Sequence, residues 1–264
     1  MDDVYRLIRN RAREIVARFP VQPFYTDFPL AVEQSRRFFQ TNPVINAIKD
    51  FIAETIGENL GHGLDHAVKV TLDAGSLIII EGEEAGYSRK DIDRRVLLAQ
   101  CSGLFHDIKR DQQSHAEKGA LFARETLRAF ACFDKNEIDD ISNAISNHEA
   151  FKSPVEIKTL RGALVSDCLY DADKFRWGPD NFTHTVWDML MISRTPVSTF
   201  FRLYPKGIKG LAKIKDTFRT KTGKKYGPLF IDTGLTIGAE LYEVIRTEFA
   251  EYLDAGPERG HDGS

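Results

Sequence analysis

Apolar residues recur every three or four positions along most of the chain, which is the spacing of a helix with one buried face. The clearest stripes are Ile92, Val96, Ala99 and Gly103, and then Ile138, Ile141 and Ile145. Strand-like alternation is nearly absent, because the one candidate, around residues 224–231, is short and rich in glycine and proline. The pattern therefore predicts an all-α protein.

Local signals mark where several of these helices begin. Asn42 precedes Pro43, which is an N-cap followed by proline at the first helical position. Ser88 and Asp134 are each followed three residues later by an acid, as in a capping box. Residues 153–156, Ser-Pro-Val-Glu, combine all three signals and predict the best-marked helix start of the chain.

The chain divides by pattern into four sections. Residues 1–55 are expected to form N-terminal helices that pack on a core formed by residues 56–195, which carries most of the chemistry-bearing residues. Residues 196–254 are expected to form a helical extension with a basic segment, and residues 255–264 a flexible tail. The first helix is predicted to bury one stripe, made of Val4, Ile8, Ala12, Ile15 and Phe19.

Composition narrows the class of protein. The 36 Lys and Arg against 39 Asp and Glu give a net charge of −3, so nucleic acid is not the expected partner. The three cysteines form no CxxC pair and indicate neither a disulfide framework nor a cysteine zinc site. The longest aliphatic run, residues 77–80, is far short of the roughly 20 residues of a spanning helix. We expect a cytoplasmic protein with no membrane partner. The sequence leaves open whether the protein forms a homo-oligomer.

Three predicted helices each place a histidine at or near the end of an apolar face. His66 opens one helix, His106 ends the stripe that begins at Ile92, and His148 extends the stripe that begins at Ile138. A single such histidine is more often a core residue, but three cases, one of them joined to Asp107, favour a shared site. Imidazoles and carboxylates on facing helices form metal sites in helical bundles, and a divalent ion compensates for their lost hydration.

These residues resemble a known family. GHGLDHAVKV contains His66, CSGLFHDIKR contains the doublet His106-Asp107, and DADKF contains Asp173. This order is similar to that of the HD superfamily of metal-dependent phosphohydrolases. SHAEKGALFA and AISNHEA, which contain His115 and His148, are similar to further elements of a subset of that family. The resemblance covers roughly residues 60–178 and implies an HD-domain helical bundle with additional N- and C-terminal helices.

The resemblance also implies a binuclear site. His66, His106, Asp107 and Asp173 would bind one divalent ion, and His115 and His148 would bind a second ion bridged to the first by Asp107. The metal, in one or two copies, would be Mn, Fe, Mg, Ni or Zn. The implied reaction is hydrolysis of a small phosphate ester or nucleotide by metal-activated hydroxide. Lys109 and Arg110 would hold a substrate phosphate, although a solvated pair of cations at a helix end fits them equally well.

One choice between neighbouring carboxylates stays open. Asp171 and Asp173 are two residues apart, so on a regular helix they point in directions about 200° apart. A buried stripe of Leu160, Leu164 and Cys168 favours Asp171, whereas the family motif favours Asp173, which we choose. Four other residues are weaker candidates. Asp65 would orient a ligand or cap the helix, and we favour the cap. His62 would share the helical face of His66 or lie in the loop before the helix, His184 is expected to be structural, and His261 lies in the tail.

Two other functions remain as alternatives. A few HD-fold proteins hold a di-iron centre and oxidise small polar substrates, and the same six residues suit iron. A non-catalytic module that binds a nucleotide is the third hypothesis. The basic segment, residues 206–225, would steer an anionic substrate or simply face solvent, and we favour the solvated face. Trp177, Asp180, Asn181 and Phe182 follow the last ligand and would line a specificity pocket or end the helix.

Overall fold

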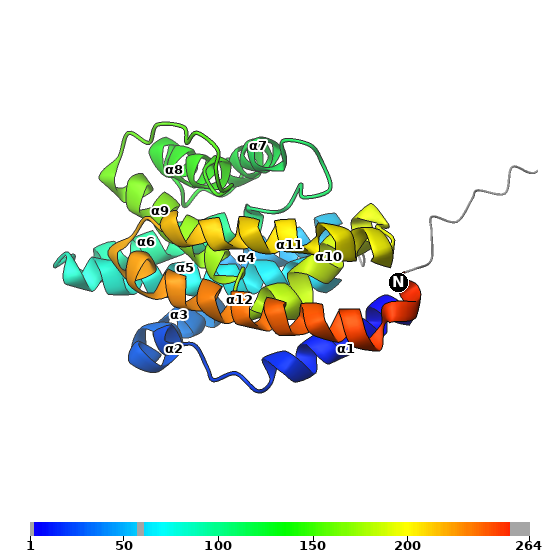
Figure 1. Cartoon of the computed structure of the whole chain (residues 1–264). Coiled ribbons are helices and arrows are strands. Elements are labelled where there is room, and N and C mark those ends of the chain that lie inside the picture. Colours follow the sequence, from blue (N-terminus) through cyan, green and yellow to red (C-terminus); the bar gives the residue numbers. More distant parts are fainter. Residues whose placement is uncertain (1–2, 57–60, 254–264) are drawn as a thin grey trace, which may run out of the picture. The chain divides into compact units, whose positions relative to one another are not determined.

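The computed structural model describes residues 3–56 and 61–253 of the 264-residue chain (Figure 1). Within these ranges the regular structure is entirely helical, which confirms the all-α prediction. Residues 224–231, the candidate strand, lie within the long helix α12 (Lys221–Glu248). The expected tail, residues 255–264, and His261 within it lie outside the described residues.

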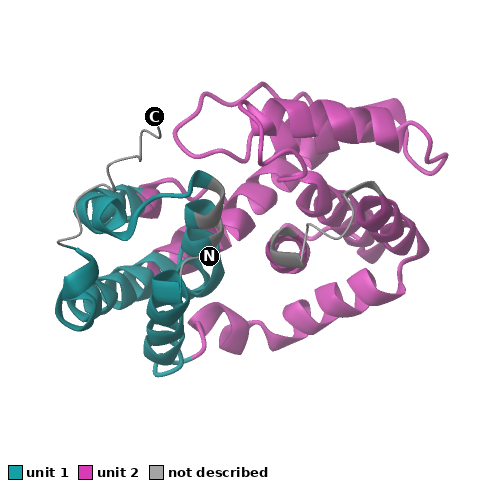
Figure 2. Ribbon diagram, turned by 90° about the vertical axis from the view of Figure 1, so that its right-hand side faces the viewer, with its two compact units in different colours: residues 1–20, 177–213, 230–264 teal, residues 21–176, 214–229 magenta. Residues whose placement is uncertain are grey.

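The chain forms two compact units (Figure 2). Unit 1 consists of residues 1–20, 177–213 and 230–264, and unit 2 of residues 21–176 and 214–229. Each unit therefore collects segments that are far apart in the sequence. The four sections expected from the sequence divide the chain only along its length, and they stay a prediction.

Unit 2 contains most of the helices. They are α2 (Pro23–Asp27), α3 (Pro29–Thr41), α4 (Pro43–Ile56), α5 (Gly61–Glu84), α6 (Arg89–Phe105), α7 (His115–Leu127), α8 (Lys135–Ser146), α9 (Leu160–Phe175), the short η3 (Ile214–Asp216) and the first turns of α12. Helix α5 packs against α3, α6 and α9, and α8 packs against α6, α7 and α9. The side chains of residues 77–80 are all buried, so α5 lies in the core of this unit.

Unit 1 is built from α1 (Asp3–Val16), a single π-helical turn η2 (Asn181–Thr185), α10 (Val186–Ser193), α11 (Val197–Lys213), the rest of α12 and η4 (Ala250–Tyr252). The predicted stripe of α1 is buried from Val4 to Ile15, and this face packs against η2. Phe19 lies beyond the end of the helix and is only partly buried. None of the described helices is long and apolar enough to cross a membrane.

Three of the four predicted helix starts are confirmed. Asn42 Oδ1 accepts hydrogen bonds from two backbone N–H groups of α4, at 2.9 and 3.2 Å. Ser88 accepts from the backbone N–H of Asp91, and Asp134 forms a complete capping box with Glu137. These caps join residues only two or three positions apart, which is why the sequence shows them.

The start predicted at Ser153 is wrong. Residues 153–158 are not helical, and α9 begins at Leu160 with Thr159 as its N-cap. The cause is a pair of hydrogen bonds between Asn147 and Val155: the side chain of Asn147 donates to the Val155 carbonyl at 3.0 Å and accepts from its N–H at 2.7 Å. These contacts hold the segment in an irregular conformation despite its capping signals.

The buried stripe expected on α9 is also wrong. Leu160 is 86% exposed and Leu164 only partly buried, whereas Val165, Cys168 and Leu169 are fully buried. The argument from this stripe in favour of Asp171 therefore has no support in the structure.

Candidate metal centre

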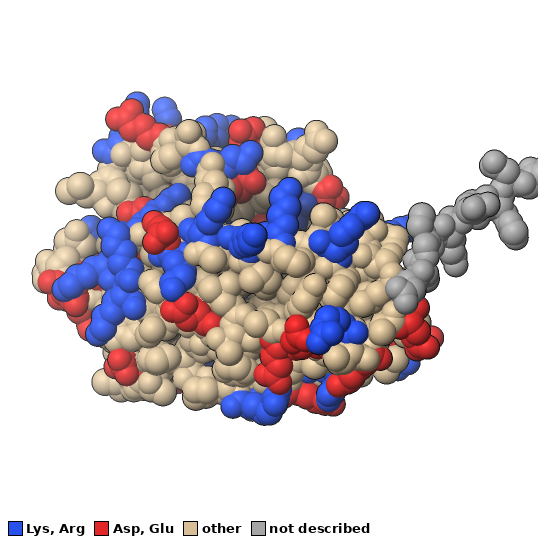
Figure 3. Space-filling view, viewed as in Figure 1, with Lys and Arg blue, Asp and Glu red and all other residues tan. Residues whose placement is uncertain are grey.

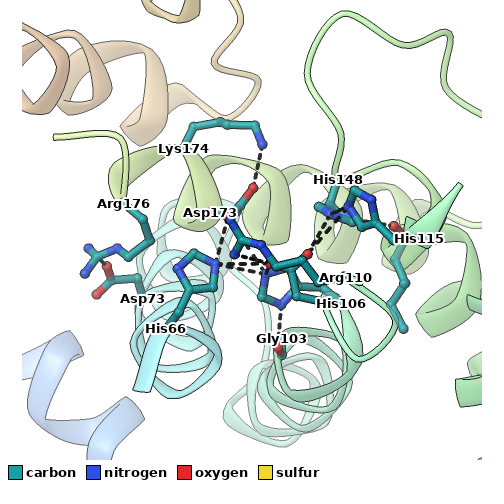
Figure 4. A network of polar contacts seen from close by, with 12 residues as sticks. His66, Asp73, Gly103, His106, Arg110, His115, His148, Asp173, Lys174 and Arg176 are labelled. Carbon is teal, nitrogen blue, oxygen red and sulfur yellow. Dashed lines mark hydrogen bonds and ion pairs between the residues drawn. The ribbon is translucent and has the colours of Figure 1, made fainter. Parts of the chain in front are cut away.

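Six donor side chains of unit 2 converge (Figure 4). They form two groups of three, and within each group one donor atom per residue lies within 4.8 Å of the others. The groups are His66, His106 and Asp173, and then Asp107, His115 and His148. These are the six residues that the resemblance to the HD superfamily implies as ligands, so the structure brings the whole expected set together.

Most of these donors lie where a helix begins or ends. His106 is the C-cap of α6, and His115 is the first residue of α7. His148 follows two residues after the end of α8, and His66 lies in the second turn of α5, which begins at Gly61. Ser114, directly before His115, has a φ of 54°, a left-handed conformation that non-glycine residues adopt mainly at turns and functional sites.

Two of the histidines are oriented by backbone carbonyls. His106 Nδ1 lies 2.7 Å from the Gly103 oxygen, and His148 Nδ1 lies 2.6 Å from the Ile145 oxygen. Because a carbonyl can only accept, each Nδ1 carries the proton, and the lone pair of the neutral ring is on Nε2. This arrangement is typical of histidines that bind a metal ion through Nε2.

Asp107 connects the two groups. Its Oδ2 lies 3.6 Å from the Nε2 atoms of both His66 and His106. Its Oδ1 lies 3.6 Å from His115 Nε2 and 3.5 Å from His148 Nε2. Each carboxylate oxygen therefore faces one pair of imidazole nitrogens, which is the geometry expected of a carboxylate that bridges two ions.

Asp173, and not Asp171, faces the histidines. Asp173 Oδ1 lies 3.3 Å from His66 Nε2, while the Lys174 ammonium contacts its Oδ2. Asp171 instead accepts three hydrogen bonds of 2.7–2.8 Å at the start of α12, from the N–H groups of Arg219 and Thr220 and from the Thr220 hydroxyl. Both carboxylates are buried, but Asp173 contacts the histidines of the cluster whereas Asp171 binds the start of α12.

The electrostatics of the cluster favour anionic carboxylates and lower the pKa values of two imidazoles, His106 and His115, through burial. Burial alone would also lower the pKa of His148, but its hydrogen bond with Asp107 outweighs burial and raises that pKa. Burial lowers the pKa of His106 to about 4. Burial alone would raise the pKa of Asp107, but His106, His148 and Arg110 outweigh it and hold the pKa well below the ordinary value. For Asp173 the contacts with Lys174 and His66 likewise outweigh burial and lower the pKa. Anionic carboxylates and neutral imidazoles are the forms that bind metal ions.

The donor set fits divalent metal ions. The two pairs of Nε2 atoms, His66 with His106 and His115 with His148, are 3.2 and 3.3 Å apart. Two ligands of one ion with bonds of about 2.1 Å are separated by about 3.0–3.4 Å. Four imidazoles and two carboxylates suit borderline transition metals such as Mn, Fe, Ni or Zn better than they suit Ca²⁺.

The two predicted phosphate-binding cations lie beside this cluster. Arg110 donates to Asp107 Oδ2 at 2.8 Å. The Lys109 ammonium lies over the Phe122 ring, 4.4 Å from its centroid. The structure therefore places Arg110 directly on a predicted ligand, while Lys109 contacts an aromatic ring; their roles toward a substrate stay predictions.

The weaker candidates have other surroundings. Asp65 is exposed and pairs with Lys69 at 3.2 Å, and it lies inside α5 and not at its start. His184 lies in η2 of unit 1, where its Nδ1 is 2.7 Å from the Thr183 hydroxyl. The side chain of His62 lies outside the described part of the structure.

The basic segment does not form one uniform face. Lys206, Lys209 and Lys213 are exposed on α11, where blue side chains lie along the surface in Figure 3. Arg219 stacks on Tyr170, 3.6 Å from the ring centroid, and Lys221 forms an ion pair with Glu84. Lys221, Lys224 and Lys225 on α12 are exposed as well, so six of the eight cations of the segment face solvent, as expected, while Lys215 and Arg219 are partly buried.

A buried ion pair beside the cluster was not anticipated from the sequence. Arg176, the C-cap of α9, contacts Asp73 of α5 (Figure 4). Tyr25 donates to the same Asp73 oxygen at 2.9 Å. Asp73 follows His66 by seven residues and so lies on the same face of α5 two turns later, and Arg176 lies one turn after Asp173. The seven-residue spacing between His66 and Asp73 was the available signal in the sequence. The partner of Asp73, Arg176, lies about 100 residues further along the chain, so the sequence did not show the pair.

Comparisons of the chain with protein-family models, with curated proteins and with solved structures found no match.

Proposed function

We propose that this protein is a metal-dependent phosphohydrolase of the HD type that acts on a small phosphate ester or nucleotide. The observation that carries the proposal is the position of Asp107, whose two oxygens each face a different pair of histidine nitrogens. A carboxylate shared in this way supports two adjacent divalent ions, an arrangement used by many enzymes that cleave phosphate esters. The order of the sequence motifs points to the same family.

The charges around the donors suit an anionic substrate. Arg110 and Lys174 each contact one of the two carboxylates, so two cationic groups lie within reach of phosphoryl oxygens. His115 and Arg110 have side chains 25% and 32% exposed, whereas His106 is fully buried. A phosphate group would therefore approach from the side of His115 and Arg110.

Each residue has a part in this proposal. Arg110 and Lys174 would bind and orient the phosphoryl oxygens, and the buried rings of His106 and His148 would keep bulk water from the other side of the centre. When bound, divalent ions would polarise a phosphoryl oxygen and activate a water molecule for attack on phosphorus. Asp107 and Asp173 would balance the charge of the ions.

The experiment is a hydrolysis assay on p-nitrophenyl phosphate, bis(p-nitrophenyl) phosphate and a panel of nucleotides. It is run with added Mn²⁺ or with a chelator, in air and anaerobically. The test variant is Asp107→Asn, and the matched control is Asp111→Asn, since Asp111 is exposed and lies four residues further along the chain. Metal content is measured for all three proteins.

We expect turnover that needs metal but not oxygen, that is lost in Asp107→Asn and that is kept in Asp111→Asn. Turnover that stops without oxygen would replace the hydrolase with the di-iron oxygenase, since the same donors suit iron. Metal binding and thermal stabilisation without any turnover would favour the non-catalytic nucleotide-binding module.

A further inference from the structure

His148 lies in an irregular segment and not within a helix. Helix α8 ends at Ser146, Asn147 is its C-cap, and residues 148–158 are not helical. The contact of His148 Nδ1 with the Ile145 carbonyl orients the ring, while the backbone N–H of His148 bonds the same carbonyl at a long 3.3 Å. The position of this donor therefore depends on what holds the C-terminal end of α8.

A side chain from far along the chain binds this end of α8. Arg219 Nη2 donates to the Asn147 carbonyl at 3.1 Å, from 72 positions further on. That carbonyl belongs to the peptide group that joins Asn147 to His148. The last carbonyls of a helix have no partner within the helix, and a cation beside them also interacts favourably with the helix dipole. Arg219 therefore caps α8 directly before a predicted metal ligand.

Two residues of α9 hold the guanidinium of Arg219 in place. Its Cζ lies 3.6 Å from the centroid of the Tyr170 ring, and its Nη1 lies 3.9 Å from Asp167 Oδ1. The Arg219 side chain is only 22% exposed. A planar guanidinium that is stacked in this way is already oriented, so it loses little further freedom when it donates a hydrogen bond. The contact with α8 is therefore made by a fixed group.

The backbone of Arg219 is fixed by the carboxylate that the metal centre does not use. Asp171 Oδ1 accepts from the Arg219 N–H at 2.8 Å, and Asp171 Oδ2 accepts from the N–H and the hydroxyl of Thr220 at 2.8 and 2.7 Å. Helix α9 therefore serves both groups of donors. Asp173 belongs to one group, and Asp171 anchors the segment that caps the helix leading to His148.

We propose that Arg219 is a positioning residue for the group of Asp107, His115 and His148, and that it sets the affinity of this group for its metal ion by fixing His148. The inference rests on the proposed two-ion centre, because the second ion is the one that this group would bind. His148 Nε2 lies 3.5 Å from Asp107 Oδ1 and 3.3 Å from His115 Nε2 (Figure 4). Without the Arg219 side chain the end of α8 is released, and these separations widen. The other group, with His66, should keep its ion.

The test variant is Arg219→Met in the full chain, which removes every donor of the side chain and keeps an unbranched chain in its place. The matched control is Arg161→Met. Arg161 is an arginine of similar exposure, 26%, that holds the opposite end of α8 through Glu137 and Asp140, at 3.2 and 3.0 Å. Both variants should lose stability, but only Arg219→Met releases the end that leads to His148.

Asp171→Asn is a second control. The amide keeps one oxygen that can accept from the Arg219 N–H, and the guanidinium keeps its contact with Asn147. This variant should therefore lose stability and still bind both ions.

Titration with Mn²⁺, followed by calorimetry and by electron paramagnetic resonance, gives the number of ions and whether they are adjacent. Two Mn²⁺ ions that share a carboxylate are exchange-coupled, whereas a single ion shows its own hyperfine pattern. We expect two coupled ions in the wild type. Arg219→Met should bind the second ion about tenfold or more weakly, as is typical when a residue that orients a metal ligand is lost, and should show the uncoupled pattern at one ion per chain. Both controls should bind the second ion within about twofold of the wild type.

An unchanged second-ion affinity in Arg219→Met would overturn this inference and leave the proposed two-ion centre intact. Equal weakening in Arg161→Met would also overturn it, because any loosening of α8 would then be sufficient. A wild type that binds a single ion would overturn the two-ion centre itself, and this inference with it. If Arg219→Met fails to fold, Arg219→Lys takes its place, since lysine keeps the charge but not the planar group that stacks on Tyr170. It should also weaken the second ion, and wild-type affinity in that variant would count against the inference.

Discussion

Gly103 of α6 lies so close to Thr71 of α5 that a Cβ on Gly103 would come within 2.8 Å of the Thr71 Cα. This approach lies next to the candidate metal centre along both helices. His106 bonds the Gly103 carbonyl from three residues further on, and His66 precedes Thr71 by five residues. The contact therefore sets the separation of α5 and α6 at the level where His66 Nε2 and His106 Nε2 lie 3.2 Å apart.

We predict that Gly103→Ala loses stability and metal affinity together. The added methyl group meets backbone and forces the two helices apart, and such overpacking costs about 1–3 kcal/mol. Urea denaturation with a chelator present measures the first effect, and titration with Mn²⁺ measures the second. Gly210→Ala is the control, because its Cβ meets nothing within 4 Å. If Gly103→Ala matched this control in both measurements, the contact would not position the histidines.

The donors of the centre could be predicted because their signals are local. The stripes of α6 and α8 lead to His106 and His148 within a few residues, and the sequence order of the donors resembles that of a known family. The sequence could not decide between Asp171 and Asp173 by periodicity, because the two carboxylates are both buried. Their difference lies in partners far along the chain: Asp171 binds residues 48 and 49 positions later.

Local signals also failed where a distant or irregular contact competes with them. Ser153 has every feature of a helix cap, yet the side chain of Asn147 holds Val155 in a non-helical segment. Asp73 and Arg176 look like ordinary surface charges in the sequence, although both are buried against each other. Helical periodicity shows which face is buried but not which residue of another helix it meets.

Asp171→Asn and Asp173→Asn should have opposite effects, although they make the same change two residues apart. Asn at position 171 cannot accept all three hydrogen bonds from Arg219 and Thr220, so we expect a loss of about 1–3 kcal/mol in the free energy of unfolding and normal metal content. Asn at position 173 removes an anionic donor, so we expect reduced metal content. Chelator-treated melts and metal analysis separate the two, and the reverse pattern would make Asp171 the ligand.

The ion pair of Asp73 and Arg176 fixes α5 against α9 beside His66 and Asp173. Removing one partner leaves a buried charge unpaired, so Asp73→Asn and Arg176→Met should each destabilise the protein by about 3–5 kcal/mol. The double variant should lose less than the sum of the two. We also expect lower Mn²⁺ affinity in all three variants. Additive losses of stability in the double variant, or an unchanged affinity for Mn²⁺, would show that the ion pair does not position His66 and Asp173.

Glu137 of α8 joins three helices of unit 2. Its carboxylate accepts from Arg94 of α6 at 2.7 Å and from Arg161 of α9 at 3.2 Å. Burial alone would raise the pKa of Glu137, but the hydrogen bond from Arg94 outweighs it and lowers the pKa below the ordinary value of 4.5. The folded protein thus binds this proton less tightly than the unfolded chain does.

The stabilisation due to Glu137 is therefore complete above the unfolded pKa, near 4.5, and is lost as the pH falls through the lower folded value. We predict that the free energy of unfolding of the wild type falls more steeply from about pH 5 to pH 3 than that of Glu137→Gln, because glutamine keeps the capping box but does not titrate. Urea denaturation at a series of pH values measures both slopes. Glu83→Gln, a change at an exposed position of α5, should keep the wild-type slope. Equal slopes for wild type and Glu137→Gln would mean that other carboxylates account for the acid sensitivity of the fold.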